Sequence, residues 1–531
     1  MTSSVAPAAL NQSPRAAELL PVLTPEQLAR IGAQGSSRAV AKGEVLFHAG
    51  SPSNRFFLVK SGAIDAVRPD GENESIIAHY GPGMFNGEIN LLSGRPGFVH
   101  IRVVESGEVI EIDRDHLVNL VQTDSELSDI LMRAFILRRL ELISAGFGDV
   151  VLMGSNHCSS TLRIKEFLSR NGHPFSFVDL DVDDGVQDLL DHFKVEPADV
   201  PVLICRGTIV LRNPSNEAIA DCLGFNQSID HTKLRDLVIV GAGPSGLAAA
   251  VYGASEGLDV LVVESAAPGG QASASSKIEN YLGFPTGISG QDLAQRAFTQ
   301  AQKFGAELMI AKSAQSLSCE RKPFAVELGN GLRVGARAVI IATGAQYRRL
   351  EVENFSHFLG SGIHYGATFI EAEICRGEEI IVVGGGNSAG QAAVYLAQTA
   401  RRVNLVVRSE GLAASMSRYL IRRIEDSPVI RLHTRTEISG LEGAIELERV
   451  RWRDLKTGEE ETRNVRHLFV MAGADPNTGW LEDCVQKDAN GFIKTGNDLT
   501  RQDLAAAEWP LSRPPYLLET SLPGVFAVGD V

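Results

Sequence analysis

The sequence has few cysteines and no long apolar run. Its 531 residues include six cysteines, at positions 158, 205, 222, 319, 375 and 484. No two of them form a CxxC pair, so neither a disulfide-framework domain nor a structural zinc site is expected, and a reduced chain in the cytoplasm is favoured. No run approaches the ~18 apolar residues that span a bilayer. The first residues lack a basic segment followed by an apolar core, so no signal peptide or membrane association is expected.

Positive charge is also scarce. Lys and Arg number 50 against 65 Asp and Glu, which gives a formal net charge of -15 at pH 7. An acidic chain repels polyanions, which argues against a nucleic acid partner. The chain is too long for one hydrophobic core, and about three or four domains are expected.

A glycine-rich turn at Gly241, Gly243 and Gly246 lies between an apolar strand and a helix of small residues. This pattern predicts a dinucleotide-binding loop, in which the glycines allow a tight turn, the approach of a pyrophosphate and close packing of the helix. Glu264 ends the next apolar strand, 18 residues after Gly246. A carboxylate at this distance is expected to accept the ribose hydroxyls of the adenosine half.

A second loop of the same kind contains Gly384, Gly386 and Ala389. Arg408 lies 19 residues beyond Ala389, at the end of the following strand, where an arginine favours the 2'-phosphate of NADP and a carboxylate would favour NAD. Ser409 follows it, so NADH stays possible, and a solvated strand end is the alternative for Arg408. Two such loops in one chain indicate FAD on one and a nicotinamide nucleotide on the other.

The first 145 residues predict a flexible tail over 1–23, a helix capped by Thr24, and a β-barrel or jelly roll built from short alternating apolar runs. Residues 57–62 and 83–89 resemble the cyclic nucleotide-binding domain, so residues 24–145 are assigned to such a domain. The resemblance implies that Gly87 and Glu88 hold the ribose of a cyclic nucleotide. Gly97 occupies the place of the family's phosphate-binding arginine, and Arg95 comes two residues too early. A nucleotide sensor, a structural barrel and a differently tuned sensor therefore remain open.

Residues 146–230 alternate strands and helices in the order βαβαβ, with strands at 150–153, 175–180 and 199–204 and a helix at 186–193. This order resembles the thioredoxin or glutaredoxin fold, which implies a cis peptide bond before Pro201. Cys158 starts a helix, where a thiolate nucleophile is favoured. Thr161 stands where the family has its second cysteine, so either monothiol chemistry or simple packing is open for Cys158. Cys205 and Cys222 are expected in the core.

The rest of the chain resembles the low-molecular-weight thioredoxin reductases, in the motifs at 268–271, 278–285, 342–345 and 523–530. The resemblance implies a discontinuous FAD-binding domain, residues 234–350 and 472–531, around an NAD(P)H-binding domain, residues 351–471. It also implies a homodimer and a domain rotation between the two half-reactions. The FAD contacts that it implies are Gly270, Gln271, Asn280, Thr343, Gly344 and Asp530.

Two departures from that family bear on function. Gly366 and Phe369 stand where the family has its redox CxxC cysteines, and Cys375 stands alone nearby. A disulfide needs an attacking thiolate and a resolving one, so the usual in-domain mechanism is not expected. The chain also stops at Val531, where the resembled reductases continue with a helix, which puts flavin retention in doubt.

The expected fold is therefore multidomain: a β-barrel or jelly-roll sensor domain, a thioredoxin-like α/β domain and two Rossmann-like FAD- and NAD(P)-binding domains. The expected function is a flavoenzyme that oxidises NADPH or NADH through FAD. Its acceptor is expected to be a partner protein, a ferredoxin-like carrier, a quinone or oxygen. Relay through Cys158, as a thioredoxin-disulfide reductase, is one alternative, and a ligand- or redox-sensing regulatory protein with a non-catalytic flavoprotein module is the other.

Overall fold

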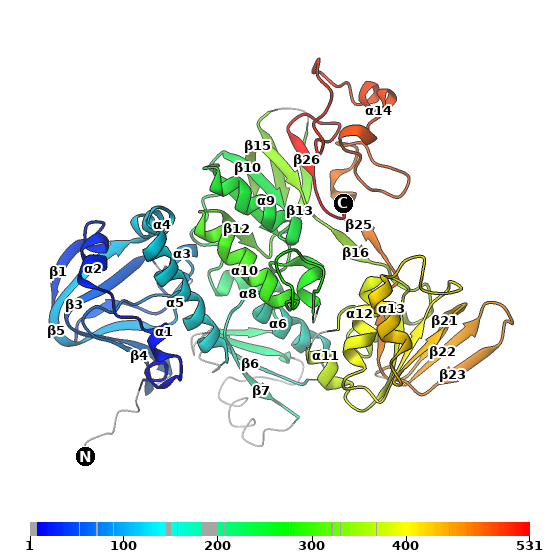
Figure 1. Ribbon diagram of the computed structural model, residues 1–531, viewed down its shortest axis with the longest axis horizontal. Helices are drawn as coiled ribbons and strands as arrows, with labels where there is room; N and C mark the ends of the chain where they lie inside the picture. The colour runs from blue at the N-terminus through cyan, green and yellow to red at the C-terminus, as the bar shows by residue number, and fades with distance from the viewer. Residues whose placement is uncertain are drawn as a thin grey trace.

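The computed structural model describes residues 8–531 except 53, 71–72, 89, 145–149, 157, 182–198, 206–208, 276, 320–321, 330, 368 and 445. Figure 1 shows the barrel at one end, a large α/β sheet in the middle and a second α/β sheet at the other end. Among the described residues, no helix is long and apolar enough to cross a membrane.

The N-terminal barrel is an antiparallel sheet in the order β1-β5-β3-β4, with β2 paired to β5. Two of the apolar runs, residues 56–59 and 64–67, lie in the single strand β3, and the pairing of β3 with β5 contains register shifts. Thr24 forms the expected capping box with Gln27 at the start of α2. The elements are β1 (Ser36–Val40), β2 (Val45–Phe47), β3 (Arg55–Asp70), β4 (Asn73–Tyr80), β5 (His100–Asp113), α2 (Pro25–Gly32), α3 (Asn90–Ser93), α4 (Arg114–Thr123) and α5 (Ser125–Ser144).

The expectation of a flexible tail over residues 1–23 is wrong for its described part. Residues 10–12 form η1 and residues 16–19 form α1. Leu10, Leu19 and Leu20 are buried in one cluster with strand residues of the barrel. Apolar burial outweighs the Ala, Ser and Pro content that suggested disorder. Residues 1–7 lie outside the described part.

Residues 150–222 form a four-stranded sheet in the order β7-β6-β8-β9. Strand β6 is parallel to β7 and antiparallel to β8. The peptide bond between Val200 and Pro201 is cis, as expected. Cys205 is buried and Cys222 packs at the edge of the same core, while the helix expected at 186–193 lies outside the described residues. The elements are β6 (Val150–Gly154), α6 (Ser159–Arg170), β7 (Ser176–Asp179), β8 (Val202–Cys205), β9 (Ile209–Arg212) and α8 (Asn216–Cys222).

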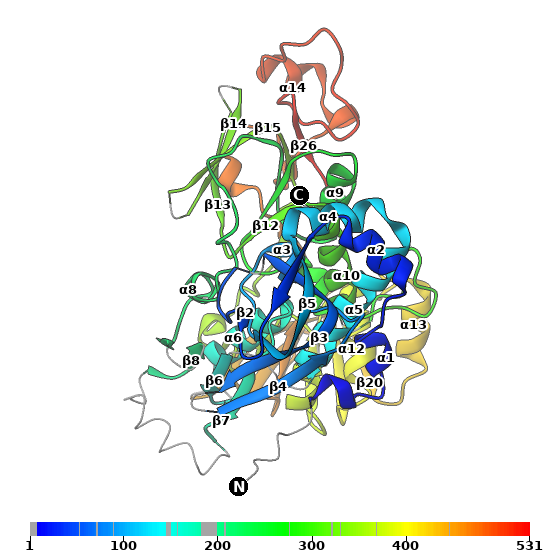
Figure 2. The same cartoon turned by 90° about the vertical axis from the view of Figure 1, so that its left-hand side faces the viewer.

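The central sheet places the first glycine loop. Strands β12, β11, β10, β15 and β26 are parallel, and β14 and β13 extend the sheet in an antiparallel hairpin. Helix α10 packs against α9 and also against α3 and α4 of the barrel, which lies in front of it in Figure 2. The elements are β10 (Arg235–Val240), α9 (Pro244–Ser255), β11 (Val260–Glu264), η3 (Gly270–Ala274), α10 (Gly290–Lys303), β12 (Glu307–Ile310), β13 (Ala314–Ser318), β14 (Phe324–Leu328), β15 (Arg333–Ile341) and β26 (Val525–Ala527).

The second α/β sheet is parallel, in the order β17-β24-β18-β19-β20, and a three-stranded antiparallel sheet, β21-β22-β23, flanks it. The chain enters and leaves this part through β16 (Ala345–Tyr347) and β25 (Ala474–Pro476), which pair with each other. The other elements are η4 (Phe355–Phe358), β17 (Ile363–His364), α11 (Phe369–Ile374), β18 (Glu379–Val383), α12 (Asn387–Leu396), β19 (Arg402–Val406), α13 (Arg418–Glu425), β20 (Ile430–His433), β21 (Thr436–Glu442), β22 (Arg449–Asp454), β23 (Glu460–Arg463) and β24 (Leu468–Val470).

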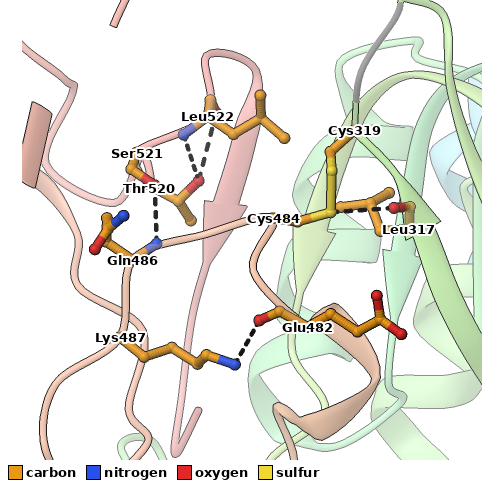
Figure 3. The surroundings of a disulfide bond; sticks show 9 residues. All are labelled: Leu317, Cys319, Glu482, Cys484, Gln486, Lys487, Thr520, Ser521 and Leu522. Carbon is orange, nitrogen blue, oxygen red and sulfur yellow. Dashed lines mark hydrogen bonds between the residues drawn. A yellow bond between two sulfur atoms is a disulfide. The ribbon is translucent and has the colours of Figure 1, made fainter. Parts of the chain in front are cut away.

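The last stretch returns to the central sheet, and it corrects the expectation that all six cysteines are reduced. Cys484, just after η5 (Gly479–Leu481), forms a disulfide with Cys319, just after β13 (Figure 3). The two cysteines are 165 residues apart, so no local spacing could reveal the bond. The remaining elements, η6 (Gly496–Asp498) and α14 (Arg501–Ala506), precede β26.

Candidate functional site

A cavity of about 970 Å³ opens at the carboxyl ends of β10, β11 and β15, and we call it the central cavity. Gly241 and Gly243 line it. A Cβ on Gly243 would meet only Gly270 Cα, at 4.0 Å, so the space before the loop is free for a ligand. A Cβ on Gly246 would lie 1.9 Å from the carbonyl oxygen of Gly241, so α9 can pack on its strand only with glycine there. The N-terminus of α9 thus faces a cradle that suits a phosphate group.

Glu264 lies in the wall of this cavity, at the end of β11. Its carboxylate accepts hydrogen bonds from the backbone N–H of Ala242 and of Ala266, both at 2.8 Å. These bonds fix the side chain beside the glycine loop, where it could receive a ribose.

Most of the other expected FAD contacts meet in the same cavity. Gly270, Gln271, Thr343, Gly344 and Asp530 all line it. The Gln271 amide donates to the carbonyl oxygen of Ala345, and the Thr343 hydroxyl donates to that of Asn477, at 2.8 Å.

Asn280 is the exception among the expected FAD contacts. It is exposed and does not line the central cavity. Two residues that the sequence did not single out, Asn477 and Trp480, do line it. They come from the returning chain after β25, and no local pattern marked them.

A second wall of the central cavity is helix α6, which belongs to the four-stranded sheet and not to the nucleotide-binding parts. The Arg170 guanidinium donates to the carbonyl oxygens of Ala267 and Gly270, at 3.3 and 3.0 Å. Cys158 is the N-cap residue of α6, and a Cβ on Gly360 would lie 2.5 Å from Ser159 Cβ. The lining residues of this wall are Ser159, Leu162, Arg163, Glu166 and Arg170.

The third wall contains Gly366, one of the two positions where the resembled reductases have their dithiol. Its lining residues are Gly360, Ile363, His364, Tyr365, Gly366 and Glu371. A Cβ on Gly366 would lie 3.2 Å from Ala274 Cβ of the central sheet's part. Tyr365 stacks on Tyr347, with ring centroids 5.6 Å apart. Cys375 is fully buried, and burial raises the pKa of its thiol to about 11. This wall therefore offers no thiolate among its described residues.

His364 also lines the third wall. Its Nε2 lies 3.2 Å from Nδ1 of His467, and its ring stacks on Phe469. Burial, reinforced by the neighbouring His467, lowers the pKa of His364 to about 3. The ring is therefore a neutral imidazole at physiological pH.

The second glycine loop lies outside the central cavity. A Cβ on Gly384 would lie 2.2 Å from the carbonyl oxygen of Met471, whereas a Cβ on Gly386, at the start of α12, would meet no atom within 4 Å. Ala389 is buried against Gly384. Arg408 is exposed after the end of β19. These residues line none of the central cavity, so reactions at the two loops require either movement or a nucleotide that bridges them.

The barrel pocket is small, about 60 Å³, and the chain fills it with its own residues. Gly87, Glu88 and Gly97 line it together with Leu10 and Leu142.

Two arginines of α5 engage the polar groups of the barrel pocket. Arg138 donates to the carbonyl oxygens of Gly87 and Leu19, both at 2.7 Å. Arg139 forms an ion pair with Glu88 at 3.3 Å. The groups that the resemblance assigned to a ribose are therefore bound within the chain.

Arg95, the displaced candidate for a phosphate contact, faces away from the barrel pocket. Its guanidinium lies 4.3 Å from the centroid of Phe225 and 5.3 Å from that of Phe298, and burial lowers its pKa to about 9. Arg95 thus packs at the junction with α10 and the four-stranded sheet.

Comparisons with known proteins agree with this geometry. The family model described as "Pyridine nucleotide-disulphide oxidoreductase" matches residues 235–531, more than half of the chain. The chain therefore belongs to this family. A second model, "Cyclic nucleotide-binding domain", matches residues 37–124.

The similar curated proteins are thioredoxin reductases. "NADPH-dependent thioredoxin reductase 3" of Arabidopsis thaliana is 33% identical over 344 residues, 61% of this chain and 60% of that protein. "Thioredoxin reductase" of Treponema pallidum is 33% identical over 296 residues, 56% of this chain and 88% of that protein. A crystal structure of Lactococcus lactis thioredoxin reductase covers 56% of this chain and 90% of its own, at 26% identity and a TM-score of 0.49.

The extent of these matches differs between relatives. The chain spans about three fifths of the Arabidopsis protein and of "Bifunctional thioredoxin reductase/thioredoxin" of Mycobacterium leprae, of which it covers 61%. The family uses FAD and NADPH, and the open space at Gly243 together with the fixed carboxylate of Glu264 fits the first of them.

Proposed function

We propose that the chain is an FAD-dependent NAD(P)H oxidoreductase of the thioredoxin reductase type whose electrons leave by a route other than an in-domain dithiol. One observation carries the proposal: the first glycine loop and Glu264 frame a cavity of about 970 Å³ at the carboxyl edge of a parallel sheet. The carboxyl edge is where such sheets bind dinucleotides.

The residues around this cavity would divide the work between them. Backbone N–H groups at the start of α9 would bind the pyrophosphate of FAD, and Glu264 would bind the ribose. Bound FAD would supply the ability to take a hydride from NAD(P)H and pass on an electron pair. Asp530 would hold the ribityl chain, and Arg408 would receive the 2'-phosphate of NADPH.

The acceptor is the point on which the chain departs from its relatives. Gly366 and Phe369 carry no sulfur, so the third wall cannot exchange electrons with a disulfide. A partner protein or a small-molecule acceptor must therefore reach the cavity directly.

One alternative route has its own support, because α6 forms a wall of the central cavity and its N-cap is Cys158. In this route the Cys158 thiolate attacks a disulfide RSSR, which forms a mixed disulfide and releases RS⁻. Two electrons from NAD(P)H then cleave the mixed disulfide to RSH and the Cys158 thiol. The balance is NAD(P)H + H⁺ + RSSR giving NAD(P)⁺ + 2 RSH.

We also infer the domain organisation from the sheets. Residues 146–230 would form a thioredoxin-like domain, supported by the strand order β7-β6-β8-β9 and by the strand directions. Residues 24–145 would form a barrel with a structural role, supported by its filled pocket. Residues 234–350 and 472–531 would form the FAD domain around the NAD(P)H domain, residues 351–471.

A homodimer is part of the proposal. Tyr252 and Leu282 are 74% and 94% exposed, and burial of such apolar surface favours association. A second copy would cover them, and light scattering would report the mass.

The test is an anaerobic titration with NADPH, followed at the flavin absorbance. Purified protein should be yellow and should bleach at one equivalent of NADPH per flavin. Protein that binds FAD but whose flavin absorbance never bleaches with NADPH would contradict the enzyme proposal.

The Cys158 route is tested with the same assay coupled to a disulfide. Cys158→Ser should keep the bleaching and lose disulfide turnover, whereas Cys222→Ser, a second half-buried cysteine in the same sheet's part, should keep both. Equal disulfide turnover in Cys158→Ser and in the unchanged protein would exclude the route.

A further inference from the structure

The disulfide between Cys319 and Cys484 joins two passages of the chain that enclose the whole second α/β sheet. Cys319 follows β13, before the chain leaves the central sheet, and Cys484 lies in the return passage, eight residues after β25. The bond therefore closes a loop that contains both connections, β16 and β25, through which that sheet is attached. Figure 3 shows the bond bridging the strand side and the return passage.

The return passage that Cys484 anchors also forms part of the central cavity. Asn477 and Trp480 line the cavity. The backbone N–H of Asn477 donates to the Gly344 carbonyl oxygen at 2.8 Å, and the Trp480 indole N–H donates to the Asn477 carbonyl oxygen at 3.2 Å. The position of residues 477–485 thus sets one side of the cavity.

Apolar packing also holds the passage around Cys484 to β13, because Leu481 and Val485 are buried in one cluster with Leu317 and Cys484 packs against this cluster. The sulfur of Cys484 lies 3.2 Å from the Leu317 carbonyl oxygen, Gln486 N–H donates to the Ser521 hydroxyl at 2.9 Å, and Lys487 Nζ donates to the Glu482 carbonyl oxygen at 2.7 Å (Figure 3). The covalent bond to Cys319 adds a direct link between this passage and β13 to that packing.

The two cysteines of the bond are partly exposed. Cys319 and Cys484 are both half-buried, whereas Cys205 and Cys375 are fully buried. A disulfide at partial exposure can be attacked by an external thiolate, because exchange requires in-line access to one sulfur.

We propose that Cys319–Cys484 is a reversible thiol–disulfide exchange site that takes dithiols as reductants and thereby tightens or loosens the 477–485 side of the central cavity. In the exchange, a dithiol R(SH)₂ gives two electrons and two protons to the bond. The products are the thiols of Cys319 and Cys484 and the cyclic disulfide of R. Reduction removes the covalent link between residues 477–485 and β13 and leaves their apolar packing, and oxidation restores the link.

The consequence for catalysis rests on the proposed function. If the enzyme delivers electrons to disulfides, the thiols that it produces reduce its own bond and loosen its flavin site, so the product restrains the reaction. An oxidising acceptor pool closes the bond and restores flavin binding.

The test uses the full-length protein in buffers of reduced and oxidised dithiothreitol, with free thiols identified by alkylation and peptide mass. Thiols should appear at Cys319 and Cys484 together, and amide exchange in residues 477–485 should quicken about tenfold, because the segment opens more often. Oxidised buffer should reverse both changes. A bond that stays closed in the folded protein, or one that opens without a change in exchange, would overturn the proposal.

Cysteine variants distinguish the effect of losing the disulfide from other effects of the dithiol on the protein. Cys484→Ser should show the fast amide exchange without dithiol and no response to dithiol. Cys319→Ser breaks the same bond and should behave alike, so it serves as the test if Cys484→Ser does not fold. Cys222→Ser should keep the full response as the matched control. Variants at 319 and 484 that exchange as slowly as the oxidised protein would contradict the proposal.

The readout distinguishes this proposal from the proposed function, because thiol counts and amide exchange need no flavin. Colourless protein that still shows the coupled opening would reject the proposed function and keep the exchange site. Yellow protein whose flavin retention and amide exchange do not change with dithiol would keep the proposed function and reject the exchange site.

Discussion

The central cavity and the barrel pocket each contain a glycine at positive φ, Gly241 and Gly87, but one is open and the other is filled. In the central cavity the glutamate is bound by backbone N–H groups at its own strand end, which leaves about 970 Å³ free. In the barrel pocket the glutamate pairs with Arg139 and the glycine carbonyl with Arg138, and about 60 Å³ remains.

The difference shows that a binding motif determines only the local backbone conformation. Whether a ligand fits depends on what the rest of the chain places in front of the motif. Around Gly243 no distant residue fills the space, whereas Leu10 and Leu142 come from both ends of the barrel's sequence to fill the space near Gly87. Burying two leucines there contributes about 3 to 6 kcal/mol, which a weak ligand could not replace.

The largest expected effect is at the first loop. Gly246→Ala should abolish flavin binding and lower the melting temperature of the flavin-free protein, because its Cβ would overlap the Gly241 carbonyl oxygen. Gly243→Ala should fold normally, since its Cβ has space, yet lose flavin affinity by more than about tenfold as the methyl group occupies the phosphate position. Flavin content and calorimetry measure both. Normal flavin content in Gly243→Ala would show that the cradle does not face FAD.

The next effect is on the filled pocket. Arg138→Met should destabilise the chain by about 2 to 4 kcal/mol, because it leaves the Gly87 and Leu19 carbonyl oxygens without a donor. The control Arg133→Met, on the exposed side of the same helix, should cost at most about 1 kcal/mol. Chemical denaturation with a barrel-specific probe measures the difference, and similar costs for the two variants would contradict the role given to Arg138.

The nicotinamide loop should respond more modestly. Arg408→Gln should lower kcat/KM for NADPH about tenfold and that for NADH much less, since only the 2'-phosphate loses its cation. Arg422→Gln, an exposed arginine nearby on α13, should change neither. Equal losses for the two nucleotides would remove Arg408 from phosphate recognition.

Acid should weaken the part of the molecule around the central cavity through His364. Burial lowers its folded-state pKa to about 3, below the ordinary value of 6.5, so the unfolded chain binds the extra proton between those two values. Stability is therefore fully present above pH 6.5 and is lost as the pH falls toward 3. His364→Leu should flatten this dependence by at most about 1.4 kcal/mol per pH unit. Denaturation at pH 5 and pH 7 measures it, and an unchanged slope would contradict a neutral His364.

The smallest expected effect is that of cyclic nucleotides on the barrel. At millimolar concentration, cyclic AMP and cyclic GMP should each shift the melting temperature by less than about 1 °C, because a ligand stabilises only the state that binds it. FAD added to flavin-free protein should give a large shift in the same assay. A large cyclic nucleotide shift would mean that Leu10 and its segment leave the pocket.

Local patterns predicted much of this molecule. The strand, glycine loop and helix at 237–250 and at 379–393, the Thr24 capping box and the cis bond before Pro201 each depend on neighbours in sequence. The requirements of phi angle, capping and close packing act within a few residues, so the sequence carries them directly.

The wrong predictions share another cause, which is that they depend on contacts between residues far apart in the sequence. The tail at 8–23 looked disordered because nothing near it in sequence could cover its leucines, and Cys319 and Cys484 looked reduced because 165 residues separate them. The assignment of Asn280 to the flavin is not among these errors and stays a prediction, since the structure shows only that this residue is exposed.

The sequence by itself determined that this chain has two glycine loops between a strand and a helix, a glutamate at the end of the strand after the first loop, and no cysteine at positions 366 and 369. Tertiary structure alone decided that α6 walls the central cavity, that the barrel pocket is closed by its own arginines and leucines, and that Cys484 meets Cys319. The physical reason is range: backbone conformation is set by adjacent residues, whereas the occupancy of a pocket is set by whichever distant side chains gain most by being buried there.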